Sequence, residues 1–223
     1  MQSQADPFIV PRCEEQIEIL YQDQDLLLIN KPSKLLSLSG QHPLNKDSVH
    51  FRLVQDYPTA TLVHRLDFGT SGIMIVALNK PANGQLTKQF QARTIKKTYQ
   101  ALLHGSVIED AGSIDLPIAK DRPNFPLQKI CQETGKQAVS RYRVLERLPQ
   151  QCSTRVEFEP LTGRTHQLRI HSRELGHPIL GCDLYASDAA FFMAERLMLH
   201  ATTIEFEHPL SGQSVSASSP CPF

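Results

Sequence analysis

The chain has 223 residues, of which 40% are apolar and 21% are charged. These proportions are ordinary for a globular protein and identify no function by themselves. Lys and Arg together number 23, and so do Asp and Glu, which makes the net charge zero. This balance excludes nucleic-acid binding through a positive field over the whole molecule, so any such site must be a local basic patch.

The charged side chains are unevenly distributed along the chain. One N-terminal stretch is acidic and two later stretches are basic. The acidic group is Glu14, Glu15, Glu18, Asp23 and Asp25; the basic groups are Lys88, Arg93, Lys96 and Lys97, then Arg164, Arg169 and Arg173. A local RNA-binding patch and an ordinary solvated surface both account for this distribution.

The cysteines and the N-terminus indicate the compartment. The five cysteines form no C-x-x-C pair, which is typical of a reduced protein rather than a disulfide framework or a zinc site. No apolar run approaches the roughly 18 residues of a membrane span. The first residues, MQSQADPFIV, lack the pattern of a secretory signal. We therefore expect a soluble, cytoplasmic protein with no membrane association.

In chain order, hydrophobic patterning first predicts a hairpin, a loop and a short helix. The hairpin strands are expected at 17–21 and 26–30, around the turn QDQD. A loop at 31–40 and a helix at 48–57 follow, and Pro58 ends the helix. The apolar run at 72–78 predicts a buried central strand.

The pattern then alternates between helices and strands. Ala82, Leu86 and Phe90 are spaced as one face of a helix through Arg93, and a strand is expected at 97–103. A proline-rich loop is expected at 121–135. The remaining predicted elements are strands at 138–146, 154–159 and 202–206, and helices at 165–175 and 187–199, with Gly176 ending the first of these helices. We expect an α+β fold on a mixed, largely antiparallel sheet, flanked by helices and loops.

A first candidate for chemistry is HRLDFGTSG at residues 64–72. The segment places the carboxylate of Asp67 on a loop directly before the predicted buried strand. A rigid strand behind an adaptable loop is a common way to present a catalytic group. A simple turn capped by Asp67 is the alternative interpretation.

A second candidate is LTGRTHQLRIH at residues 161–171. In a helix beginning at Thr165, the side chains of His166, Arg169 and Arg173 share one face, and Leu168 and Leu175 share an adjacent apolar face. A cation beside a catalytic carboxylate favours its ionised form, which a nucleophile needs at neutral pH. A purely structural arginine–carboxylate pair is equally compatible with the pattern.

A third candidate is KKTYQA at residues 96–101. Strand alternation directs Lys97 and Tyr99 to one face. An aromatic ring beside a cation offers an unstacked base a surface and its phosphate a charge. Such a tyrosine can also simply fill the edge of a core.

These three segments together closely resemble the RluA family of pseudouridine synthases. The family signature H-R-L-D-x-x-T-S-G matches residues 64–72, and its K-x-Y motif matches residues 97–99. Its late motifs, T-G-R-[TS]-H-Q-[LI]-R-x-H and G-H-P-I-x-G, match residues 162–171 and 176–181. The resemblance extends from about residue 17 to the C-terminus and includes NKPS at 30–33 and QKICQETGK at 128–136. It implies one catalytic domain at 17–223 after an N-terminal extension at 1–16.

The resemblance implies roles for individual residues. Asp67 would be the nucleophile, Tyr99 would stack on the target uracil, and Arg169 would pair with Asp67. Leu168 would line the base pocket, Arg65 would enter the RNA where the uridine leaves, and His64 would support the loop. The remaining residues expected to contact substrate are Lys97, Arg164 and His166.

Two features depart from the family pattern. Many members carry an N-terminal S4-type RNA-binding domain, whereas only 63 residues precede the signature here, so we expect RNA recognition by the catalytic domain itself. The family usually has Asp directly after the last glycine of G-H-P-I-x-G. Here Cys182 follows Gly181 and the acid comes one place later, as Asp183, to which the sequence assigns no role.

The implied reaction isomerises uridine without gain or loss of atoms, and the resemblance accordingly implies no cofactor. The implied substrates are 23S ribosomal RNA and a tRNA anticodon stem-loop, and the protein is expected to be monomeric. Three alternatives remain open at this stage. A uracil-releasing glycosylase would normally use two carboxylates, a non-catalytic RNA-binding module would not need Asp67, and a metallohydrolase would use His166, His171, His177 and His200.

Overall fold

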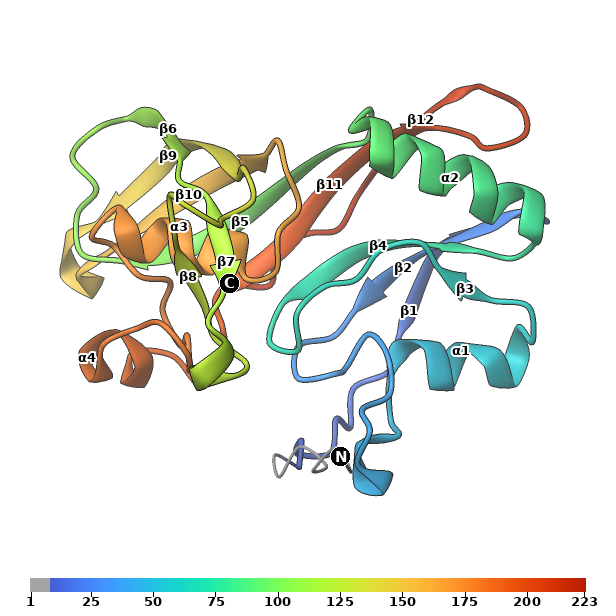
Figure 1. Ribbon diagram of the computed structural model, residues 1–223, viewed down its shortest axis with the longest axis horizontal. Helices are drawn as coiled ribbons and strands as arrows, with labels where there is room; N and C mark the ends of the chain where they lie inside the picture. The colour runs from blue at the N-terminus through green and yellow to red at the C-terminus, as the bar shows by residue number, and fades with distance from the viewer. Residues whose placement is uncertain (1–8) are drawn as a thin grey trace. The chain divides into compact units, whose positions relative to one another are not determined.

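The computed structural model describes residues 9–223, which form two compact units (Figure 1). The first unit contains the described residues up to Ile95 together with Ile204–Ser219, and the second contains Lys96–Thr203 and Pro220–Phe223. Strand β11 (Leu199–Glu207) contributes its first residues to the second unit and its last residues to the first. Residues 1–8 of the predicted N-terminal extension lie outside the described residues.

The sheet of the first unit is built around an all-buried strand. Strands β1 (Glu18–Gln22), β2 (Leu26–Lys31) and β4 (Ser71–Ala77) are antiparallel neighbours in that order, and β3 (Thr61–Leu62) also pairs with β4. Strand β12 (Ser214–Ser218) pairs with β11. Every residue of β4 is buried, as the apolar run predicts. The β1–β2 hairpin is also confirmed, and its turn is closed by the Asp23 carboxylate, which accepts from the backbone of Asp25 and Leu26.

Two capped helices cover this sheet, and Figure 1 shows α1 (Val49–Asp56) and α2 (Lys80–Ala92) on opposite sides of β1, β2 and β4. The Ser48 hydroxyl caps α1 by accepting from the Phe51 amide. Asn79 caps α2 in the same way through the Ala82 amide. Helix α1 matches its predicted range within a residue at each end, and α2 ends one residue before the predicted Arg93. Ala82 and Leu86 of α2 are buried as expected.

The second unit is an antiparallel sheet with a separate small ribbon. Its sheet contains β5 (Lys96–His104), β10 (Ser153–Pro160), β9 (Val139–Leu148) and β6 (Ala111–Asp115) in that order, with β11 beside β5. Strands β7 (Ile118–Lys120) and β8 (Gln128–Ile130) form the ribbon. The main core cluster lies between this sheet and α3 and includes Leu103, Val156, Phe158, Leu168 and Ile170.

Helix α3 (Gln167–Glu174) ends as the sequence predicts but begins two residues later. Gly176 adopts a φ of +87°, and its amide donates to the Arg173 carbonyl. The His177 amide donates to the Ser172 carbonyl, which completes a Schellman motif. At the other end, His166 has a left-handed conformation with φ +57° and lies outside the helix.

The predicted helix at 187–199 is wrong over most of its length. Only Asp188–Phe192 is helical, as α4. The Met198 amide donates to Leu180 and the Met198 carbonyl accepts from Leu102, so pairing with distant chain segments replaces helical bonding there. The loop predicted at 121–135 is also wrong in part, because it contains β8, which pairs with β7. Strands β3, β6, β7 and β12 have patterns too short or too polar for the sequence to reveal.

Short 3-10 turns connect several elements, at Pro43–Asn45, Arg122–Asn124 and Pro149–Gln151. The fold is α+β on a largely antiparallel sheet, as predicted. Within residues 9–223, no helix has the length and apolar character needed to cross a membrane.

Candidate active site

In the first unit, Asp67 lies on the loop between β3 and β4. The Thr70 amide donates to the Asp67 carbonyl at 3.1 Å, which closes a four-residue turn. Asp67 is half-buried, and Gly72 follows with a φ of +116°, a conformation that side-chain-bearing residues avoid. Asp67 therefore lies on the turn that leads into the buried strand β4, as predicted.

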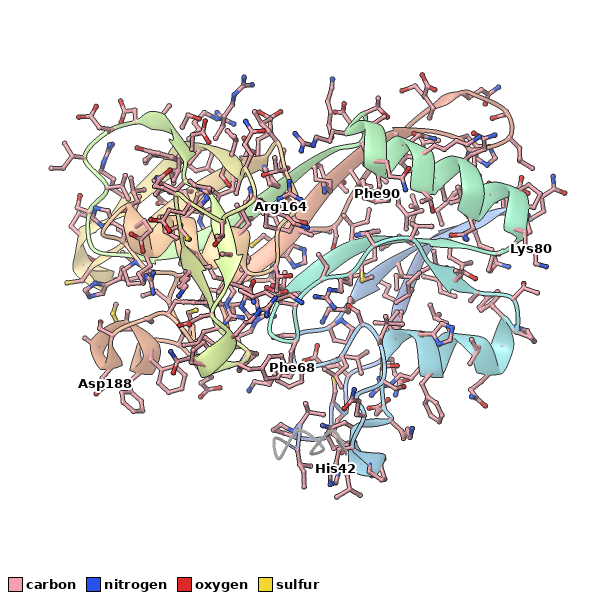
Figure 2. The ribbon with its side chains drawn as sticks, in the orientation of Figure 1. His42, Phe68, Lys80, Phe90, Arg164 and Asp188 are labelled. Carbon is pink, nitrogen blue, oxygen red and sulfur yellow. The ribbon has the colours of Figure 1, made fainter. Side chains whose placement is uncertain are left out.

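The backbone of this loop is held by the segment that follows β2. The Ser37 hydroxyl donates to the Leu66 carbonyl at 2.7 Å and accepts from the Leu66 amide at 3.1 Å. The Ser33 hydroxyl donates to the Gly69 carbonyl at 2.7 Å. Figure 2 labels Phe68 on this loop, between the two residues whose carbonyls these hydroxyls bind. The loop is thus fixed on both sides of Asp67.

A buried ammonium adds a third connection. Lys31 is completely inaccessible to solvent, and its Nζ donates to the carbonyls of Pro32 at 2.8 Å and Leu35 at 2.7 Å. It also donates to the Phe68 carbonyl at 3.3 Å. A buried charge is costly unless it is fully hydrogen-bonded. The three carbonyls therefore stabilise the charge, and the charge in turn fixes the loop.

His64, the first residue of the signature, contacts β4 and α2. Its Nε2 accepts from the Ile75 amide at 2.9 Å, so the neutral ring carries its proton on Nδ1. The ring stacks on Phe90 of α2 with centroids 4.8 Å apart, and Figure 2 labels Phe90 on that helix. The supporting role expected for His64 remains a prediction. Arg65, the residue expected to enter the RNA, is exposed.

In the second unit, Gln167 connects the start of α3 to its surroundings. Its Oε1 accepts from the Thr162 hydroxyl and the Arg164 amide, at 2.7 and 3.0 Å. Its Nε2 donates to the Val139 carbonyl and the Ser140 hydroxyl, at 3.0 and 2.9 Å. Arg164, labelled in Figure 2, donates from Nε to the Gln137 carbonyl. The turn before α3 is therefore fixed against β9.

Tyr185 is the common neighbour of the three residues predicted to share one face. His166 Nδ1 lies 2.7 Å from the Tyr185 hydroxyl. The guanidinium carbons of Arg169 and Arg173 lie 5.3 and 5.5 Å from the centre of the tyrosine ring. The hydroxyl also accepts from the Gln128 amide of β8 at 2.9 Å. The three predicted residues do come together, although His166 precedes the helix.

Arg169 is held by the segment around Gly181. Its side chain is only 5% exposed. Its Nε donates to the sulfur of Cys182 at 3.3 Å, and its Nη2 forms an ion pair with Asp183. The sequence assigned Asp183 no role, and this ion pair corrects that prediction. Asp67 belongs to the first unit and Arg169 to the second, and the expected pair between them remains a prediction.

Tyr99 and Leu168 border one apolar cluster. Leu168 is buried within the main core cluster of the second unit, and Tyr99 packs against that cluster while half-buried. Lys97 precedes Tyr99 by two residues on β5, and burial lowers the pKa of its ammonium from the usual value. The base-contacting roles expected for Lys97 and Tyr99 remain predictions.

The histidines considered for a metallohydrolase have other partners. His171 contacts the Ser140 hydroxyl and the Leu116 carbonyl, and His177 contacts the His104 carbonyl. In the described part of the chain, the side chains close enough together to share a metal ion are those of Asp23, Asp25 and His208, at the β1–β2 turn. None of the four proposed histidine ligands belongs to that group.

Sequence reasoning missed several residues that hold the site. They are Lys31, Ser33, Ser37, Asp183 and Tyr185. Lys31 and Ser33 lie in the NKPS segment of the family resemblance, which was a signal without an assigned role. The other three act through contacts distant in sequence, and no local pattern indicates them.

Comparison with known protein families identifies the class of enzyme to which this chain belongs. The profile of RNA pseudouridylate synthases matches residues 25–174, and the chain belongs to this family. It is 51% identical over 194 residues to a Yersinia pestis protein named dual-specificity RNA pseudouridine synthase RluA, covering 87% of this chain and 94% of that protein.

Further relatives agree with this assignment. The protein of the same name from Escherichia coli K12 is 47% identical over 213 residues, covering 96% of this chain and 97% of the relative. Among solved structures, human RNA pseudouridylate synthase domain containing 1 superposes with a TM-score of 0.80 at 32% identity. That match covers 96% of this chain and 86% of the human one.

Proposed function

We propose that this pseudouridine synthase uses Asp67 as its nucleophile on uridines extruded from structured RNA. The observation that carries the proposal is the way Asp67 is presented. Lys31, Ser33 and Ser37 hold the backbone of its loop at Phe68, Gly69 and Leu66, on both sides of Asp67. A group held in a fixed position needs no reorganisation in the transition state.

The reaction breaks the bond from C1′ to N1 of uracil and forms a bond from C1′ to C5. The base stays in the site and turns between the two steps, N1 gains a proton, and C5 loses one. Asp67 has three routes available: attack on C1′, addition to C6, or assistance in a proton shift at C2′. Each route requires one ionised carboxylate and a base that cannot escape.

The other site residues divide between the base and the RNA backbone. Tyr99 stacks on the extruded uracil, Leu168 lines its pocket, and Arg169 pairs with Asp67. Arg65 fills the space that the uridine leaves, which offsets part of the few kcal/mol of unstacking. Lys97, Arg164 and His166 contact the surrounding RNA.

The relatives' name indicates two kinds of RNA target. We propose that this chain also acts on both 23S ribosomal RNA and a tRNA anticodon stem-loop, as a monomer in the cytoplasm. Two such RNAs can share one site if the enzyme recognises loop shape rather than a long sequence. Mapping pseudouridine in RNA from a strain that lacks this gene tests the assignment. Loss at sites in both RNA classes supports it, and loss in one class alone contradicts dual specificity.

A direct test of the reaction uses a stem-loop RNA tritiated at uracil C5. The wild-type protein should release tritium while all uracil stays covalently attached to the RNA. Free uracil would identify a glycosylase, and tight binding without tritium release would identify a non-catalytic RNA-binding module. Either result would overturn the proposal.

A further inference from the structure

Arg169 is a nearly buried cation that contacts three residues of one short segment. Asp183 pairs with Nη2, Cys182 accepts from Nε, and the guanidinium carbon lies over the Tyr185 ring. A buried guanidinium is costly without a charged partner, and a thiol is only a weak acceptor. Among these three contacts, Asp183 therefore supplies the strongest restraint on the arginine.

The segment that carries Asp183 is itself fixed. The Leu180 amide donates to Leu102 of β5, and the Gly181 amide donates to Ala190 of α4. Gly181 has a φ of +68°, and a Cβ there would lie 1.9 Å from the Arg196 carbonyl oxygen. Only glycine fits this approach, so the backbone before Asp183 has little freedom. Asp183 is thus an anchored carboxylate rather than a mobile surface acid.

We propose that Asp183 is a positioning residue for Arg169, which sets the direction of the guanidinium before substrate binds. The inference rests on the proposed function, in which Arg169 pairs with the nucleophile. The side chain of Asp183 is 58% exposed, whereas that of Arg169 is 5% exposed. The exposed carboxylate therefore restrains a nearly buried cation through their ion pair, and it need not touch the substrate.

The test measures kcat and KM for one stem-loop RNA with three variants of Asp183. In Asp183→Ala, kcat should fall about tenfold or more, as expected for a lost charge-assisted hydrogen bond, while KM changes by less than about threefold. Asp183→Asn keeps a hydrogen-bond acceptor but lacks the charge. Its kcat should lie between those of Asp183→Ala and the wild type. Asp183→Glu should recover part of the activity. Asp188→Asn, which neutralises an exposed carboxylate on α4, is the matched control and should stay within about twofold of wild type.

A double-mutant cycle separates this inference from the function on which it rests. Once Arg169 is replaced by Ala, the change Asp183→Ala should alter kcat by less than about twofold, because the group it positions is gone. The same loss in both backgrounds would overturn the inference. Full activity in Arg169→Ala would refute the role of Arg169 itself. Loss in Arg169→Ala with full activity in Asp183→Ala would refute only the positioning role.

Thermal unfolding of each variant checks for a merely structural effect. If Asp183→Ala fails to fold, Asp183→Asn decides the question. A lowered kcat at an unchanged unfolding midpoint supports positioning. Wild-type kcat in Asp183→Asn, or a kcat loss that Asp183→Glu does not partly reverse, contradicts it.

Discussion

The two units hold their functional groups in different ways. In the first unit, the ammonium of Lys31 and two hydroxyls bind the backbone of the loop that carries Asp67. In the second unit, the contacts around Arg169 are made to the side chain itself, by Asp183, Cys182 and Tyr185. Changes that loosen the first unit should therefore alter loop geometry and stability together. Changes in the second unit should affect individual groups with smaller effects on folding.

The largest effect is expected from Lys31→Met. The substitution leaves the carbonyls of Pro32, Leu35 and Phe68 without their donor in a site closed to water. We expect a loss of about 3 kcal/mol or more in the free energy of unfolding, together with most of the activity. Urea denaturation and tritium release measure the two effects. Lys34→Met, at an exposed lysine of the same segment, is the control, and equal losses in both variants would contradict the account.

Ser37→Ala and Ser33→Ala form a graded pair on the same loop. Ser37 satisfies both the amide and the carbonyl of Leu66, whereas Ser33 binds only the Gly69 carbonyl. We expect losses of about 2 kcal/mol for Ser37→Ala and about 1 kcal/mol for Ser33→Ala, with kcat falling in the same order. Urea denaturation measures these losses. A larger loss for Ser33→Ala than for Ser37→Ala would contradict the view that these hydroxyls act by fixing the loop backbone.

Tyr185→Phe tests the second unit through a smaller change. It removes the hydroxyl that contacts His166 and the Gln128 amide but keeps the ring against Arg169. We expect a loss of about 1 kcal/mol in stability and a kcat reduction of roughly fivefold or less. Tyr57→Phe, which removes an exposed hydrogen bond to Gln22, should change neither quantity measurably. A complete loss of activity in Tyr185→Phe would contradict the division of roles between hydroxyl and ring.

The smallest effect is a pH dependence of stability at His171. Burial lowers the pKa of this histidine, so the unfolded chain binds the proton more tightly than the folded protein. The pKa of the histidine in the unfolded chain is about 6.5, so above this pH its titration should leave stability unaffected. Stability should fall as the pH drops from there toward the pKa in the folded protein. In the wild type, the midpoint of urea denaturation should be lower at about pH 5.5 than at about pH 7.5. In His171→Gln, this difference should be smaller. An equal difference in both proteins would contradict the assignment.

The sequence predicted the first unit more completely than the second, for physical reasons. The hairpin, both helices and the buried strand of the first unit have local signals, such as the Ser48 and Asn79 caps and the apolar run at β4. In the second unit, residues 193–199 were predicted as helix, but pairing of Met198 with Leu102 and Leu180 overrides local propensity. The strands of the β7–β8 ribbon have three residues each, too few for a periodic signal.

In the candidate site too, the sequence revealed only the residues that lie in local patterns. The motifs located Asp67, Tyr99 and Arg169, because each lies in a recognisable local pattern. The groups that hold the Asp67 loop and the Arg169 side chain come from segments distant in sequence, so no local pattern indicates them. Asp183 illustrates the difference, since its position one place late in the motif gave no role, and the structure pairs it with Arg169.

The most direct test of the central claim is Asp67→Asn. The amide has nearly the same shape as the carboxylate but cannot act as a nucleophile, and the contacts that hold the loop backbone remain. The variant should bind stem-loop RNA within about threefold of wild type and release no tritium from RNA labelled at uracil C5. Continued tritium release by the purified variant would contradict the account.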